Sequence, residues 1–281
     1  GGHLQNINGH AHSGSGEYCI AEADESDRSL LELPKSLSVV NNIDLEHLET
    51  YKDLDDVKGT FLQFINDTPF FGKTVLNIDD ANIRSILSKT TAKFATYGIE
   101  QKADFQANNI DLQPEYSTFD LYKNDTLINT ILMPMPGIHN IYNCLAAISL
   151  SHEMEIPQNT IKSAIASFKG VEQRFTYRGT LAHTNIEIFD DYGHHPKEIE
   201  CTLKIAKKRA KGRLIVLFQP HRFSRTKHLW NDFVDVFQNA EIDHLMITDI
   251  HPANEHPLPN ISSEKLVQEI KAKQIDYLPL Q

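Results

Sequence analysis

Cysteine is scarce in this chain, and the three that occur, Cys19, Cys144 and Cys201, are widely separated. They form neither a disulfide framework nor the paired spacing of a zinc site, so a reducing, cytoplasmic location is expected. No apolar run approaches the roughly 20 residues that a membrane span needs. The first residues lack the apolar core of a signal peptide, and we expect no membrane insertion.

An excess of basic residues is also missing, because 27 lysines and arginines are outnumbered by 38 aspartates and glutamates, giving a formal net charge of −11. This balance argues against a general nucleic-acid binder, whereas one bound nucleotide needs only a local cationic pocket. The 281 residues leave room for two ordinary domains. A content of 40% hydrophobic and 23% charged residues is typical of a globular protein.

Apolar strands alternate with amphipathic helices in the first part of the chain, which predicts crossover connections and a largely parallel sheet. Residues 103–133 then form short apolar runs broken by Asn, Asp and Pro. These runs predict a small antiparallel meander attached to the sheet. The expected strands are 18–21, 37–43, 74–78 and 93–98, and the expected helices are 53–66, 81–88, 139 to about 155, and 160–168.

The alternating pattern restarts after Gly170-Val-Glu-Gln-Arg-Phe175. We therefore expect one domain at 1–171 and a second, doubly wound domain at 172–281. Leu214–Phe218 is apolar at every position and is predicted to be a central parallel strand. The other expected strands are 175–181, 186–189 and 244–250, and the expected helices are 196–210, one ending near 238, and 262–272.

Titratable side chains gather after the strand at 186–189, in Asp190-Asp-Tyr-Gly-His-His-Pro196. Ligands of open α/β sheets bind beyond the carboxyl ends of the strands. His221, Arg222 and Arg225 follow the next strand and are expected at the same edge, where two arginines suit a carboxylate or a phosphate. The same residue types also cap turns and form ion pairs, so both interpretations remain open.

Two stretches of the first domain have a similar ambiguity. The run Glu22-Ala-Asp-Glu-Ser-Asp27 is either a solvated acidic turn or a source of hard oxygen ligands for a divalent cation. His139, Asn140 and Asn143 lie at the start of a predicted helix. There they either cap the helix or, together with its N–H groups, bind a nucleotide.

Taken in order, six stretches of the chain resemble the Mur ligases of peptidoglycan synthesis, and are most similar to the branch that adds alanine. Each motif is weak alone, but six in the family's order, spread over most of the chain, are highly specific. The stretches are Ile20-Ala-Glu-Ala-Asp-Glu-Ser-Asp27, Asn42-Ile-Asp-Leu-Glu-His47, Gly137-Ile-His-Asn-Ile-Tyr-Asn143, Arg174-Phe175, Asp190-Asp-Tyr-Gly-His-His-Pro196 and Phe218-Gln-Pro-His-Arg-Phe-Ser-Arg-Thr226.

The resemblance implies an α/β fold, with part of a central ATPase-type parallel sheet domain followed by a Rossmann-like ligase domain. It also implies an ATP-dependent ligase that uses Mg²⁺ and joins L-alanine to the lactyl carboxylate of UDP-N-acetylmuramate. ATP would phosphorylate the carboxylate, and the amine of alanine would displace phosphate from the acyl phosphate. Domain closure and cationic side chains would assist the transfer.

The resemblance also assigns roles to individual residues. Glu22 and His47 correspond to the family's metal ligands. The two arginines fit the carboxylate of alanine, and His194 is expected to orient or deprotonate its ammonium group. The expected nucleotide-binding residues are His139, Asn140, Asn143, Arg174, Asp190 and Asp191. The expected residues at the alanine and acyl-phosphate end are Tyr192, His194, Arg222 and Arg225.

Parts of the family's pattern are missing. The Gly-rich phosphate loop that should precede the acidic run is absent, and Gly72-Lys-Thr74 does not replace it, because it precedes a strand and Asp67 occupies the place of the loop's first glycine. The uridine-binding domain is also missing, and the second domain ends early. We therefore expect an internal piece of a longer enzyme that has no ligase activity alone.

Three alternatives stay open. The first is the sister ligase that reattaches recovered tripeptide to UDP-N-acetylmuramate. The second is a metal-dependent phosphohydrolase, with Asp190, Asp191, His194 and His195 as metal ligands. The third is a nucleotide-binding remnant that has no catalytic activity.

Overall fold

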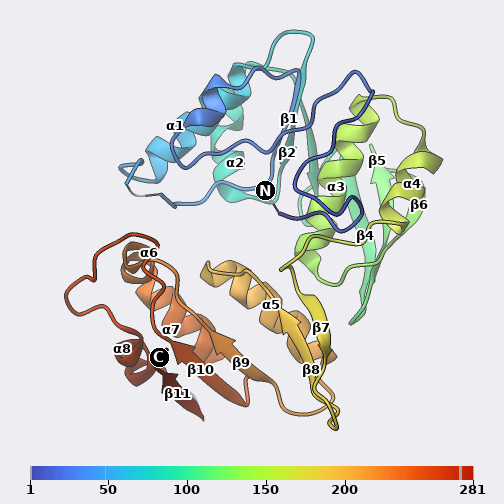
Figure 1. The fold of residues 1–281 in the computed structure, drawn as a ribbon. Helices are drawn as coiled ribbons and strands as arrows, with labels where there is room; N and C mark the ends of the chain where they lie inside the picture. Colours follow the sequence, from blue (N-terminus) through green and yellow to red (C-terminus); the bar gives the residue numbers. More distant parts are fainter. Residues whose placement is uncertain (1, 48, 272–273, 281) are drawn as a thin grey trace. The chain divides into compact units, whose positions relative to one another are not determined.

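The computed structural model describes residues 2–47, 49–271 and 274–280. The chain forms two compact units, which we call unit 1 (His3–Gly170) and unit 2 (Val171–Gln281) (Figure 1). No helix in the described part is long and apolar enough to cross a membrane.

Unit 1 is built on one six-stranded sheet in the order β1-β2-β3-β4-β5-β6. The first four strands are parallel, and β4, β5 and β6 form an antiparallel meander, so both features predicted from the sequence are confirmed. The strands are β1 (Leu37–Val40), β2 (Lys73–Asn77), β3 (Phe94–Gly98), β4 (Phe105–Leu112), β5 (Ser117–Lys123) and β6 (Thr126–Met133).

The strand expected at 18–21 is not formed. Tyr18 is 57% exposed and Ile20 is 83% exposed, so this short apolar run buries neither face and has no sheet to join. The helices of unit 1 lie close to their expected positions. They are α1 (Leu54–Asn66), α2 (Ala81–Ile86), α3 (Ile138–Glu153) and α4 (Gln158–Ala166), with short 3₁₀ turns η1 (Ser29–Glu32) and η2 (Leu87–Lys89).

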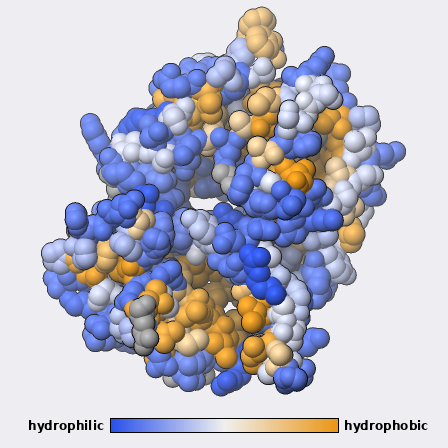
Figure 2. Space-filling view, viewed as in Figure 1, coloured by the Kyte–Doolittle hydropathy of each residue, from blue (hydrophilic) through white to orange (hydrophobic). Residues whose placement is uncertain are grey.

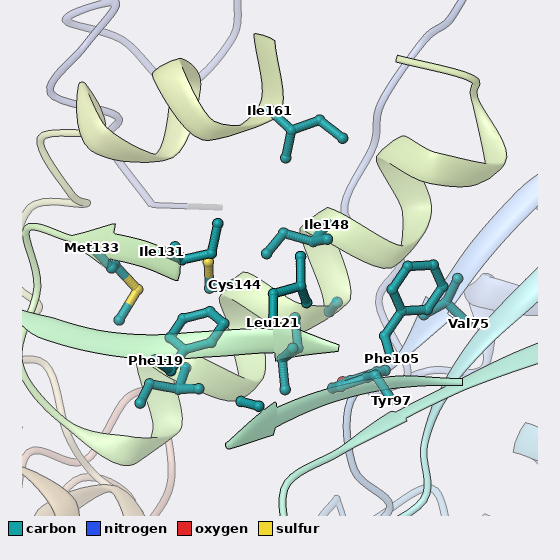
Figure 3. Packing of buried hydrophobic residues seen from close by; sticks show 14 residues of the cluster. Val75, Tyr97, Phe105, Phe119, Leu121, Ile131, Met133, Cys144, Ile148 and Ile161 are labelled. Atoms are coloured by element: carbon teal, nitrogen blue, oxygen red, sulfur yellow. The ribbon is translucent and has the colours of Figure 1, made fainter. Parts of the chain in front are cut away.

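Helix α3 packs against β2, β3 and β4 and supplies much of the main core of unit 1. Ile141, Leu145 and Ile148 of α3 are fully buried, at the helical spacing that places them on one face. Figure 3 shows Ile148 and Cys144 facing side chains of the sheet, among them Phe105. Each such side chain contributes about 1.5–3 kcal/mol by burial, so α3 is held firmly along its length.

Unit 2 contains a parallel sheet in the order β11-β10-β9 and an antiparallel pair, β7 and β8. The expected helix at 262–272 begins close to its predicted start, after the N-cap Ser262, but it ends at Glu269, because the backbone of Ile270 is extended. Ala272 lies outside the described residues. The elements are β7 (Thr176–Thr180), β8 (Glu187–Asp190), α5 (Pro196–Arg209), β9 (Ile215–Phe218), α6 (Phe223–His228), α7 (Trp230–Asn239), β10 (His244–Thr248), α8 (Ser263–Glu269) and β11 (Ile275–Leu278).

The prediction that Leu214–Phe218 forms a central strand is wrong. β9 lies at the end of its sheet, with β10 as its neighbour. Phe218 is buried against Phe233 and Phe237 of α7, but Ile215 is 44% and Leu217 61% exposed. Figure 2 shows apolar surface gathered where β8 and β9 lie in Figure 1. An apolar run therefore identified a strand but not its place in the sheet.

Candidate functional site

Polar side chains gather where β8 ends and α5 begins. His195 is the N-cap of α5, and its side chain accepts a hydrogen bond from the backbone N–H of Lys197 at 3.3 Å. In return, the Glu198 carboxylate accepts from the backbone N–H groups of His194 (3.1 Å) and His195 (3.3 Å). This capping box fixes the strand–helix turn, so the side chains on it have a rigid base.

Arg174, which is expected to reach the nucleotide, is bound by the same carboxylate. Its Nη1 lies 3.0 Å from Glu198 Oε1. Burial alone would raise the pKa of Glu198, but the backbone N–H and imidazole of His194 and the Arg174 guanidinium outweigh it and lower the pKa. Glu198 is therefore ionised at neutral pH and orients Arg174. Sequence reasoning missed Glu198, although its spacing from His195 is that of a capping box.

The two aspartates after β8 have different partners. Asp190 Oδ2 accepts hydrogen bonds from Nη2 (2.9 Å) and Nε (3.3 Å) of Arg178. Asp191 accepts from the backbone N–H groups of Phe175 (2.8 Å) and Gly193 (2.7 Å). A Cβ atom at Gly193 would lie 2.6 Å from Asp191 Oδ1 and would displace this carboxylate oxygen. Asp191 thus uses both of its oxygens to hold the turn together.

These contacts give no support to a metal centre at this turn. Asp190 and Asp191 have arginine and backbone partners, and His195 caps α5. Within the described part of the chain, no group of three or more His, Cys, Asp or Glu side chains could hold a metal ion. The ligand set that a phosphohydrolase would need is therefore not assembled by these residues.

Tyr192, His194, His221 and Arg225 come together at the ends of β8 and β9. The ring centroids of Tyr192 and His194 are 5.2 Å apart, and those of His194 and His221 are 6.2 Å apart. Arg225 Nη1 lies 3.2 Å from His221 Nδ1. The prediction that these residues share one edge relied on β8 and β9 being parallel neighbours. The structure brings the residues together, but β8 pairs with β7 in a separate antiparallel sheet.

The hydrogen bonds of His194 define its tautomer. Its Nδ1 lies 3.1 Å from the backbone oxygen of Tyr192, which can only accept. Nδ1 is also 3.7 Å from a carboxylate oxygen of Glu198. Both neighbours favour the proton on Nδ1, which leaves a lone pair on Nε2 of the neutral ring. His194 can therefore accept a proton or a hydrogen bond at Nε2.

Another histidine, His251, lies beside this group and was not identified from the sequence. Its ring centroid is 5.3 Å from that of His221, and a parallel bridge joins the two residues. Arg222 N donates to His251 O at 2.8 Å, and Arg222 has a φ of 68°. With a ψ of 136°, this positive-φ conformation lies outside the left-handed helical region and costs a non-glycine residue about 1–3 kcal/mol. The continued pairing of β9 and β10 therefore holds Arg222 in a strained position at the edge.

The surroundings of His221 favour the neutral form of its imidazole, whereas the neighbouring arginines stay charged. Burial lowers the pKa of His221 below its usual value, and the nearby Arg225, His251 and His194 lower it further. An imidazole that stays neutral leaves the positive charge to the arginines. This edge of unit 2 thus offers guanidinium groups for an anion beside the neutral ring of His221, whose Nδ1 contacts Arg225.

In unit 1, the expected nucleotide residues lie on the first turns of α3. The N-cap is Gly137, which has a φ of 98° and no side chain to cover the helix terminus. Asn140 Nδ2 donates to the backbone oxygen of Pro136 at 2.8 Å, so this asparagine braces the turn. Asn143 is exposed and His139 partly exposed. The helix end therefore offers N–H groups and polar side chains to a ligand.

The expected metal ligands lie near an acidic loop. His47 has a side chain that is 17% exposed, and its Nε2 lies 3.7 Å from a carboxylate oxygen of Glu25. Its Nδ1 lies 3.4 Å from Glu49. Glu22 is exposed in the same loop. Carboxylates with one imidazole can supply the one or two protein ligands that Mg²⁺ usually takes when phosphate and water complete its shell.

Gly72, Lys73 and Thr74 have structural partners. A Cβ atom at Gly72 would lie 2.1 Å from the backbone oxygen of Ser36. Lys73 Nζ pairs with Glu153 at 2.5 Å. Thr74 Oγ1 is fully buried and hydrogen-bonds with Ser38 and Thr68. The triplet starts β2 and does not form a phosphate loop, as predicted from its position before a strand.

Comparison with known proteins identifies the family. Residues 3–151 match the Mur ligase middle domain, and residues 173–279 match the Mur ligase glutamate ligase domain. The chain belongs to the Mur ligase family. The resemblance found in the sequence motifs is thereby confirmed.

Relatives within the Mur ligases match nearly the whole chain. A protein from Geotalea uraniireducens is 43% identical over 281 residues, which cover 99% of this chain and 60% of that protein. A protein from Hydrogenobaculum sp. is 45% identical over 280 residues, which cover 99% of this chain and 61% of that protein. Both are named UDP-N-acetylmuramate–L-alanine ligase. The chain thus spans about 60% of the length of these curated relatives.

Solved Mur ligases share the fold. A UDP-N-acetylmuramate–alanine ligase from Thermotoga maritima has a TM-score of 0.73 at 23% identity, covering 92% of this chain and 54% of that one. A MurF ligase from the same organism, solved in complex with ADP, has a TM-score of 0.66 at 17% identity, covering 87% of this chain and 53% of that one. At these identities the similarity concerns the fold, and it confirms the expected α/β class.

Proposed function

We propose that this chain is the ATP-binding and alanine-binding part of an ATP-dependent ligase that joins L-alanine to UDP-N-acetylmuramate in peptidoglycan synthesis. Residues 1–171 are then the remainder of the central ATP-binding domain, and 172–281 belong to the C-terminal ligase domain. The observation that carries the proposal is the group of His194, His221 and Arg225 at one strand edge. It occurs in a chain over 40% identical to relatives with that name.

Arg222 and Arg225 bind the carboxylate of alanine in this proposal. A guanidinium group donates two parallel hydrogen bonds to a carboxylate, which fixes the amino acid in position and orientation. His194 Nε2 carries the lone pair and accepts a proton from the alanine ammonium, because Nδ1 is occupied by the oxygen of Tyr192. The amine then becomes a nucleophile close to its target.

Each unit supplies its own proposed nucleotide contacts. In unit 1, the amides of Asn140 and Asn143, with His139, bind adenine at the start of α3 in this proposal. In unit 2, Arg174 is proposed to bind the phosphates or ribose, and Asp190 and Asp191 the ribose. Glu22 and His47 are the protein ligands of Mg²⁺, and their hard oxygen and imidazole donors fit that ion. When bound, Mg²⁺ offsets the negative charge on the phosphate oxygens.

A chimera tests the proposal. This chain replaces the matching 60% of the Geotalea uraniireducens relative, so that the remaining parts come from that protein. We expect formation of ADP, phosphate and UDP-N-acetylmuramoyl-alanine that requires both ATP and L-alanine, measured by mass spectrometry. Arg225→Gln in the chimera should raise the KM for alanine about 10- to 100-fold, since a charge-assisted hydrogen bond contributes about 1.5–3 kcal/mol.

Lys211→Gln, a change of an exposed lysine in the loop after α5, is the control and should leave the KM for alanine unchanged. A chimera that binds ATP but forms product only with a tripeptide would instead assign the chain to the sister ligase. A chimera that binds ATP and forms neither product would favour a nucleotide-binding remnant.

A further inference from the structure

The carboxylate of Asp79 joins three segments of unit 1 that are distant in sequence. It follows β2, and its Oδ2 accepts hydrogen bonds from the backbone N–H groups of Ile99 (2.6 Å) and Glu100 (2.9 Å). Its Oδ1 accepts from the N–H of Gln101 at 2.7 Å. A fourth donor comes from α3, because Tyr142 Oη lies 2.9 Å from Asp79 Oδ2. Asp79 thus connects the ends of β2 and β3 to α3.

The structure makes room for this carboxylate. A Cβ atom at Gly98, the last residue of β3, would lie 3.0 Å from Asp79 Oδ1 and 3.0 Å from a side-chain carbon of Ile78. The neighbouring Asp80 contacts α2 instead. Its side chain accepts a hydrogen bond from the backbone N–H of Ile83 and so caps the N-terminus of this helix. Adjacent aspartates therefore anchor different helices.

Tyr142 lies on the part of α3 that carries the proposed nucleotide residues. Residues three and four apart on a helix are neighbours on its surface, so His139 and Tyr142 lie side by side, and Asn143 is next to Tyr142 in sequence. The apolar side of α3 is packed into the core by Ile141 and Leu145. Packing fixes the helix against the sheet, while the bond from Tyr142 to Asp79 fixes its first turns at the strand ends.

We propose that Tyr142, through its hydrogen bond to Asp79, is a positioning residue for nucleotide binding: it sets where the first turns of α3 present His139, Asn140 and Asn143 to the adenine base. This inference rests on the proposed function, because it assumes that this helix end is the adenine site. Tyr142 itself need not touch the nucleotide.

Tyr142→Phe tests the proposal, since it removes one hydroxyl group and keeps the ring. The affinity for Mg-ATP is measured in the chimera by calorimetric titration, together with the melting temperature, because this chain lacks the family's phosphate loop. A hydrogen bond to a charged group changes an equilibrium by up to about a hundredfold, and we expect about tenfold weaker Mg-ATP binding. In the chimera, KM for ATP should rise by the same factor while kcat and the KM for alanine stay unchanged.

Tyr97→Phe is the matched control. Tyr97 is fully buried in the same sheet, and its hydroxyl donates to Asn41 Oδ1 at 2.7 Å, so its loss also removes a partly buried hydrogen bond of a tyrosine. We expect both variants to lower the melting temperature and only Tyr142→Phe to weaken Mg-ATP binding. Equal affinity of Tyr142→Phe and the unaltered chimera, or equal weakening by both variants, would overturn the positioning role. If the unaltered chimera binds no Mg-ATP, the nucleotide site itself is refuted.

Discussion

Single residues at the edge of unit 2 combine strain with charge. Arg222 has a φ of 68°, a conformation in which glycine is unstrained. Its backbone N–H is tied to His251, and its backbone oxygen accepts from Thr226 Oγ1 at 2.8 Å. The backbone of Arg222 is therefore strained at the end of β9, at a residue that we propose binds the carboxylate of the substrate.

Substitutions at Arg222 should reverse the usual order of glycine and alanine. Arg222→Gly relieves the positive-φ strain, whereas Arg222→Ala keeps it, so we expect the glycine variant to be about 1 kcal/mol more stable toward urea. At Arg225, inside α6, the alanine variant should be the more stable by about 1 kcal/mol. If alanine were the more stable at both positions, the strain at Arg222 would not be present in solution.

His221 should make stability depend on pH. Its folded-state pKa is lowered by burial and by nearby Arg225, His251 and His194. The unfolded chain, with a histidine pKa of about 6.5, therefore binds the proton more readily. Stability should be highest above pH 6.5 and should fall as the pH drops below it.

The measurement is the free energy of unfolding between pH 5 and pH 7. His221→Gln should give a flatter dependence than the unaltered chain. His183→Gln, in an exposed turn, should leave the slope unchanged. Burial and Lys123 also lower the pKa of His152, so part of the slope should remain in the His221 variant.

At the scale of elements, the sequence predicted which segments are helices and strands better than it predicted their neighbours. The meander of β4 to β6 followed from short apolar runs separated by turn residues, because local turn chemistry decides such pairings. The position of β9 did not follow, since an apolar run has the same composition in the centre and at the end of a sheet. The prediction of a strand at Tyr18–Ala21 was wrong, because the composition of a segment does not show whether another strand pairs with it.

The contact between β1 and β2 requires a glycine. Gly72→Ala would place a carbon 2.1 Å from the Ser36 oxygen, which forces the two strands apart. We expect a loss of about 2–4 kcal/mol in the free energy of unfolding. Gly59→Ala is the contrasting variant, because its Cβ would meet nothing within 4 Å inside α1. It should stabilise the chain by about 1 kcal/mol. Similar small effects at both positions would contradict the close approach at Gly72.

At the scale of the whole molecule, binding of a ligand should increase the free energy of unfolding. A ligand that binds only the folded chain at ten times its Kd adds about 1.4 kcal/mol. In the chimera, we expect Mg-ATP to raise the melting temperature more than ATP with a chelator, because the chelator removes the metal that Glu22 and His47 are proposed to bind. His47→Ala should remove the difference between the two conditions, while Glu49→Gln should keep it. An equal increase with and without Mg²⁺ would argue against the metal site.

The sequence revealed the motifs of the site but not their connections. The sequence predicted that His194 and His221 meet, because each follows a strand of unit 2. The capping-box spacing of Glu198 was present in the sequence, but the roles of His251 and Tyr142 were not, because they depend on partners up to 63 residues away in the chain. Such long-range hydrogen bonds leave no periodic signal in a single sequence.

The position of the Gly-Lys-Thr triplet matters for searches that assign phosphate loops from short sequence motifs. A pattern search that relied on these three letters would put the triphosphate at the amino end of β2. Asp79 and Tyr142 mark the opposite end of the same strand, about 13 Å away at 3.3 Å per residue. An inhibitor designed against Lys73 would then be directed at the amino end of β2, where Lys73 forms an ion pair with Glu153 of α3. A Gly-Lys-Thr triplet indicates a phosphate loop only where it follows a strand, and here it precedes one.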